Sequence, residues 1–140
     1  MTYTPYQRLV RSSAIYDILL TTAFAVPVLA SMKVDLLRWI HISTGMAGHF
    51  PLFDPMHMVF VHLLGSVVTV WSLLRIFHPQ ALFGWYDAMA RFAFSLAMAW
   101  GLWQGGSSLL WWFLIPELSW GIVQWLGYHR QRHPETAQLA

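Results

Sequence analysis

The chain has 140 residues, of which 57% are hydrophobic and only 10% are charged, and its mean hydropathy is +0.49. A water-soluble domain carries about 25% charged residues, because its surface must face water. The composition therefore excludes an ordinary soluble domain and indicates an integral membrane protein. The net charge of +2 comes from scattered basic residues beside apolar stretches, so nucleic acid is not an expected partner. Without cysteine, disulfides, thiolate metal sites and cysteine nucleophiles are excluded.

Four apolar stretches follow one another along the chain, each close to the ~20 residues that a helix needs to cross a bilayer. The runs are continuous and do not alternate, which favours helices over membrane strands. Short connections between the later stretches predict antiparallel neighbours. We therefore expect one all-α membrane domain over residues 1–140, an antiparallel four-transmembrane-helix bundle. The predicted spans are residues 14–32, 55–74, 84–103 and 109–127.

The first stretch loosely resembles a signal peptide, because Arg8 and Arg11 precede it and the tripeptide at 28–30, Val-Leu-Ala, loosely resembles a cleavage site. Asp17 lies inside the apolar run and argues against cleavage, so we expect a retained helix.

The connection over residues 33–54 has apolar side chains at helical spacing, namely Val34, Leu37 and Ile40. This pattern predicts a short amphipathic helix at the membrane interface, between the first two spans, followed by a loop. A continuation of the first helix beyond the bilayer fits the pattern equally well.

Basic residues in the flanks predict the orientation, because they concentrate on the cytoplasmic side. One side carries five arginines and the other carries two basic residues, so we expect both termini in the cytoplasm. We expect the protein in the inner membrane of the cell. The five are Arg8, Arg11, Arg75, Arg130 and Arg132, and the two are Lys33 and Arg38.

Two segments 70 positions apart share a pattern, since "YDILLTTAF" at 16–24 and "YDAMARFAF" at 86–94 repeat Tyr, Asp, Ala and Phe at the same spacing. We interpret this as a tandem repeat of two helical hairpins. A repeat of this kind can form a binding site at its interface. It can equally be a duplication that built a stable bundle.

Polar residues inside the spans fall on one stripe per helix, so we expect them to face the bundle interior. Asp17, Asp87 and Arg91 are predicted to form an inner layer near the cytoplasmic face. Two carboxylates around one guanidinium indicate a structural ion-pair network. Binding of an anionic or polar group of a ligand is the alternative.

His62 and Glu117 are predicted to share a second, outer layer. A carboxylate and an imidazole in contact can act as a catalytic acid/base pair or a proton relay. Alternatively they hydrogen-bond to each other and hold two helices together. The residues expected to contact a ligand are His62, Ser66, Arg91, Glu117 and Gln124.

Four groups that can bind metals lie near the loop before the second span, namely His41, His49, Asp54 and His57. Their spacing matches no zinc signature, so no metal site is expected. The pattern indicates no particular cofactor.

We expect a small integral membrane protein that binds a hydrophobic molecule or serves as an accessory subunit of a membrane complex. Its partners would be the lipid bilayer, a hydrophobic small molecule, and either further copies of itself or the other subunits. The first alternative is a membrane enzyme or redox component acting on a lipid-like or quinone-like substrate, with His62 and Glu117 as its acid/base pair. The second alternative is a small proton-coupled transporter.

Overall fold

The computed structural model of the chain describes residues 3–132, and these residues confirm the prediction of an all-helical protein. The single β interaction in this range is an isolated bridge between His49 and Gly106. The elements in order are α1 (Pro5–Ala25), α2 (Pro27–Ser43), α3 (Pro55–Phe77), α4 (Ala81–Trp103), the 3-10 helix η1 (Ser108–Leu110) and α5 (Trp111–Arg132).

Two helical segments are long and apolar enough to cross a membrane: α3, and the segment Ser108–Arg132 that joins η1 to α5. The pair α1 and α2 meets the same criterion when taken together, but it is bent by 105°. Large apolar side chains are exposed on all five α-helices, as expected for surfaces that face lipid. Two or three helices can thus cross a membrane, which indicates a membrane protein.

The first predicted span, residues 14–32, is broken near its middle and is not one continuous helix. Val26 has an extended backbone (φ −107°, ψ 117°) between α1 and α2. Pro27 explains the break, because proline has no N–H to donate and disfavours helical geometry in the residue before it. The helix expected within 33–54 consequently begins six residues earlier, at Pro27.

The break leaves carbonyl groups at the end of α1 that other side chains contact. His62 Nδ1 on α3 lies 3.0 Å from the carbonyl oxygen of Phe24, and the ammonium of Lys33 donates to the carbonyl of Leu20. Buried backbone carbonyls need such partners, because an unpaired polar group in an apolar interior is costly. His62 and Lys33 therefore help to hold the bend.

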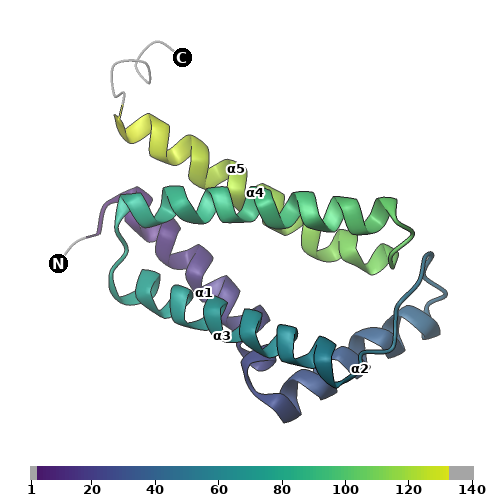
Figure 1. Cartoon of the computed structure of the whole chain (residues 1–140). Helices are drawn as coiled ribbons and strands as arrows, with labels where there is room; N and C mark the ends of the chain where they lie inside the picture. The colour runs from purple at the N-terminus through teal and green to yellow at the C-terminus, as the bar shows by residue number, and fades with distance from the viewer. Residues whose placement is uncertain (1–2, 133–140) are drawn as a thin grey trace.

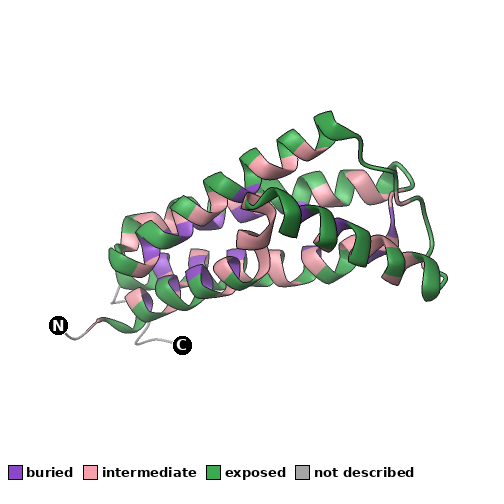
Figure 2. Cartoon of the chain, turned by 90° about the horizontal axis from the view of Figure 1, so that it is seen from below, coloured by how far each residue is buried: buried purple, intermediate pink, exposed green. Residues whose placement is uncertain are grey.

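The long helices form two pairs, with α1 packed along α3 and α4 packed along α5. The pairs lie close together at the end of the molecule that carries both termini and are further apart at the other end (Figure 1). Most of the buried residues lie on inward faces in the half nearer the termini, as Figure 2 shows. This arrangement is compatible with a repeat of two hairpins, and the repeat itself stays a prediction.

The apolar core sits at the end with the termini, where Tyr6, Val10 and Tyr128 form a buried cluster. Tyr6 donates its hydroxyl to the carbonyl of Gln124 on α5 at 2.9 Å. Gly84 on α4 lies so close to α1 that a Cβ there would come within 2.4 Å of Val10. The core thus fixes α1 against both α4 and α5.

At the opposite end, the loop after α2 is hydrogen-bonded to the turn between α4 and α5. His49 N–H donates to the carbonyl of Gly105 at 2.9 Å, and Ser108 N–H donates to that of Ala47 at 2.8 Å. His41 Nδ1 on α2 lies 2.7 Å from Ser107 Oγ. We call this set of contacts the loop clasp; it joins α2 and the loop after it to the turn between α4 and α5.

We expect Gly48→Ala to open the loop clasp. Gly48 has a φ of +86°, and a Cβ there would lie 2.2 Å from the carbonyl oxygen of Gly106. Strain and clash together should cost about 1–3 kcal/mol, and amide hydrogen exchange at Ser108 should become faster. Gly45→Ala is the control, because Gly45 also has a positive φ (+65°) but has no atom within 4 Å of the added Cβ. Equal exchange in the two variants would contradict the expectation.

Candidate functional site: a buried cluster of charged side chains

Five charged side chains from four helices meet inside the molecule, in the half that carries the termini. All except Glu117 belong to buried residues, and the side chain of Glu117 is 19% exposed. We call them the charge cluster: Asp17 on α1, Arg75 on α3, Asp87 and Arg91 on α4, and Glu117 on α5.

Arg91 is the centre of the cluster, because its guanidinium reaches carboxylates on three helices. Nη2 donates to both carboxylate oxygens of Asp17 at 2.8 and 2.7 Å. Nε donates to Asp87 Oδ2 at 3.0 Å, one turn earlier on the same helix. Nη1 donates to Glu117 Oε2 at 2.8 Å. A planar guanidinium with several fixed donors suits this role, which a lysine could not take over.

Arg75 is the second cation, and its side chain is fully buried. Its Nη2 lies 2.5 Å from Asp17 Oδ2 and its Nη1 lies 2.5 Å from Asp87 Oδ2. Both groups also donate to serine hydroxyls at 3.2 Å, Nη1 to Ser13 and Nη2 to Ser72. Arg75 thereby links α3 to the carboxylates of α1 and α4.

Neutral donors complete the coordination of Asp87. The indole N–H of Trp71 donates to Oδ1 at 2.9 Å, and Gln124 Nε2 donates to Oδ2 at 2.9 Å. Gln124 Nε2 also contacts Ser13 Oγ at 2.7 Å. Such contacts matter because a buried charge must be paired and hydrogen-bonded to be tolerated. The cluster therefore fixes the register of the four helices at one level.

The three residues expected to form the inner ion-pair network, Asp17, Asp87 and Arg91, are in direct contact. Sequence reasoning counted Arg75 only among the cytoplasmic flanking residues and missed its place in the cluster, where the structure shows it fully buried. Two signals could have found it. Arg75 continues the polar face of α3 three residues after Ser72, and two carboxylates facing one arginine leave a negative charge that a second cation would balance.

The structure does not bring His62 and Glu117 together. Glu117 joins Asp17 and Asp87 around Arg91, while His62 contacts the backbone of α1. No hydrogen bond or ion pair links them within residues 3–132. Of the expected ligand-contacting set, Arg91, Glu117 and Gln124 lie in or beside the charge cluster, and Ser66 is exposed on α3. The outer layer expected from the sequence is therefore not formed.

The four groups considered for a metal site make separate structural contacts. Asp54 caps α3: its Oδ1 accepts from the His57 N–H at 2.9 Å, and the His57 ring faces back to the Asp54 N–H. The hydrogen bond from the His57 backbone lowers the pKa of Asp54 below its usual value. His41 and His49 belong to the loop clasp. Across the described range, no group of three or more His, Cys, Asp or Glu side chains is arranged to hold a metal ion.

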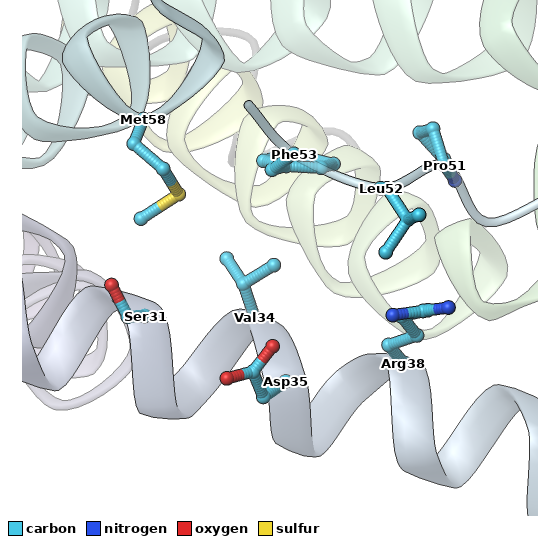
Figure 3. Close-up of a pocket in the computed structure, with 8 residues that line it drawn as sticks. All are labelled: Ser31, Val34, Asp35, Arg38, Pro51, Leu52, Phe53 and Met58. Carbon is cyan, nitrogen blue, oxygen red and sulfur yellow. The ribbon is translucent and has the colours of Figure 1, made fainter. Parts of the chain in front are cut away.

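A pocket of about 240 Å³ lies between α2, the segment 51–53 and the start of α3. Figure 3 shows its two kinds of wall. The polar wall comes from α2, with Ser31, Asp35 and Arg38. The apolar wall comes from Leu52, Phe53 and Met58. None of the ion pairs formed within residues 3–132 involves Asp35 or Arg38.

Comparison of the chain with protein-family models, with curated proteins and with solved structures finds no match. The cluster is densely paired and ties helices together, whereas the pocket has unpaired charges next to apolar surface.

Proposed function

We propose that the protein crosses the inner membrane with α1, α3, α4 and α5, and that α2 lies at the outer interface. α4 contains Asp87 and Arg91, but the cluster pairs both, so lipid does not contact them. Cytoplasmic termini are supported by the arginines at that end, which still outnumber the basic residues of α2 by four to two once Arg75 is set aside. These four are Arg8, Arg11, Arg130 and Arg132.

We propose that this membrane protein binds a lipid-like molecule with a zwitterionic polar end in the pocket beside α2. The observation that carries the proposal is that the pocket combines an arginine and an aspartate, neither of them in an ion pair, with an apolar wall. Arg38 suits a phosphate and Asp35 suits an ammonium group, as in a phosphoethanolamine head. Leu52, Phe53 and Met58 would contact the acyl chains. Small-molecule sites commonly combine apolar walls with a few placed polar groups.

Two substitutions should separate the contributions of the two charges. Arg38→Gln should weaken binding of phosphatidylethanolamine and of phosphatidylglycerol alike, because both carry a phosphate. Asp35→Asn should weaken only the lipid with the amine. A charge-assisted hydrogen bond contributes about 1.5–3 kcal/mol, so each substitution should lower the affinity for the lipid about tenfold or more. The measurement is native mass spectrometry of protein released from nanodiscs of stated lipid composition.

Arg130→Gln is the matched control, because Arg130 is exposed on α5 at the other end of the molecule. It should retain wild-type lipid binding. Undiminished binding in both pocket variants, or an equal loss in the control, would contradict the proposal.

The enzymatic alternative with a His62–Glu117 acid/base pair gains no support from the geometry, since each residue has a different partner.

A further inference from the structure

The charge cluster contains one more carboxylate than it has guanidinium groups. Asp17, Asp87 and Glu117 face Arg75 and Arg91, and both cations already contact more than one carboxylate. With every group ionised, the cluster carries one uncompensated negative charge. In a membrane interior such a charge is costly, about 2.5–3.5 kcal/mol even on the mildest scales, so a cation or a proton should balance it.

The hydrogen bonds show which carboxylate has room for a proton. Both oxygens of Asp17 accept from Arg91, and both oxygens of Asp87 accept from N–H donors. A proton on Asp17 or Asp87 would point at a group that already donates a hydrogen bond to that carboxylate. Glu117 accepts from Arg91 through Oε2 alone, and no donor contacts its Oε1 within the described residues. Its side chain is also the most exposed of the three, at 19% against 8% and 5%.

A buried hydroxyl lies at the same level as Glu117. A Cβ on Gly121 would lie 3.3 Å from Arg91 Cβ, so these two residues face each other across the antiparallel helices α4 and α5. Ser95 is one turn after Arg91 and Glu117 is one turn before Gly121, which places Ser95 and Glu117 at the same level on the two helices. Ser95 Oγ is buried and has no hydrogen-bond partner, so it is free to accept a hydrogen bond from a carboxyl group that turns toward it. A hydroxyl can accept a hydrogen bond from a protonated carboxyl.

The charged and titratable groups around Glu117 come from three helices. Arg91 and Asp87 lie on α4, Asp17 and Tyr16 on α1, and Arg75 on α3 completes the cluster. Arg91 contacts Glu117 directly but shares its charge among three carboxylates.

We propose that Glu117 binds a proton at neutral pH, turns its carboxyl group to donate that proton in a hydrogen bond to Ser95, and so makes the charge cluster electrically neutral. The cluster is then a proton-binding site and not only a set of ion pairs. Deprotonation of Glu117 would return one negative charge to the junction of α1, α4 and α5. The proposal is independent of lipid binding at the pocket beside α2.

The test is infrared spectroscopy of the purified protein at neutral pH, because protonated carboxyl groups have a C=O stretching band separate from that of carboxylates. The chain has six acidic residues, and those exposed to water are ionised under these conditions. We expect one protonated carboxyl band in the wild type and its loss in Glu117→Gln. Asp54→Asn is the control and should leave the band intact, since Asp54 is exposed and outside the cluster.

Absence of the band in the wild type would overturn the proposal, as would its persistence in Glu117→Gln. A rise in stability with Na⁺ in place of choline, without any band, would assign the balancing charge to a metal cation instead. If Glu117→Gln does not fold, Ser95→Ala decides the question. The band should then move to higher wavenumber because the carboxyl loses its acceptor, and an unmoved band would overturn the proposal.

Discussion

Arg91→Met is expected to lower the free energy of unfolding by about 3–5 kcal/mol, the cost of removing one partner from a buried ion pair. Methionine is unbranched and apolar, so the main loss is that of the guanidinium. Asp17, Asp87 and Glu117 would then face Arg75 as the single cation of the cluster. Two of these carboxylates belong to buried residues and cannot gain water in compensation.

The effect can be measured by unfolding in mixed micelles with increasing dodecyl sulfate, followed by the fluorescence of the nine tryptophans. Arg130→Met removes an exposed arginine from α5 and should change the stability by no more than about 0.5 kcal/mol. A similar, small effect of both substitutions would show that the charge cluster does not stabilise the fold.

Gly65→Ala is expected to cost about 3 kcal/mol, at the upper end of the range for overpacking a buried position. A Cβ on Gly65 would lie 2.5 Å from the carbonyl carbon of Phe24 and 2.6 Å from the nitrogen of Ala25. These are backbone atoms, so α1 and α3 would have to separate. The separation should also weaken the contact of His62, one turn earlier, with the Phe24 carbonyl.

Gly101→Ala is the matched control, because the first atom that its Cβ would meet is the end of the Leu110 side chain at 3.3 Å. A flexible side chain can yield where a backbone cannot, so we expect a loss of less than about 1 kcal/mol, the usual size of a surface or adaptable change. Equal losses at the two glycines would mean that α1 and α3 are not held as closely as the structure shows.

The helices could largely be predicted from the sequence, because long apolar runs ended by proline, glycine or charged residues leave little choice. The predicted span 84–103 and α4 end at the same residue, and α3 begins where expected, at Pro55. The first span was wrong for a physical reason. Hydropathy measures composition, whereas the break at Val26 depends on the backbone restrictions of Pro27.

The charge cluster could be predicted in part. Helical spacing places Asp87 and Arg91 together, and their burial follows from the apolar surroundings. Arg75 was assigned to the flank because hydropathy ends the span at Leu74, yet long side chains at helix ends can turn inward to a counter-ion. The partner of His62 could not be predicted, since a backbone carbonyl freed by a bend has no signature among side chains.

The way the charges are divided between the helix pairs has a consequence for biogenesis. The pair that is synthesised first contributes Asp17 and Arg75, which contact each other and cancel. The later pair brings Asp87 and Arg91 one turn apart on a single helix. Each half can therefore enter the bilayer with its own counter-ion, before it has met the other half. Glu117 lies on α5, downstream of the other four members of the charge cluster, and it arrives when both arginines are already engaged.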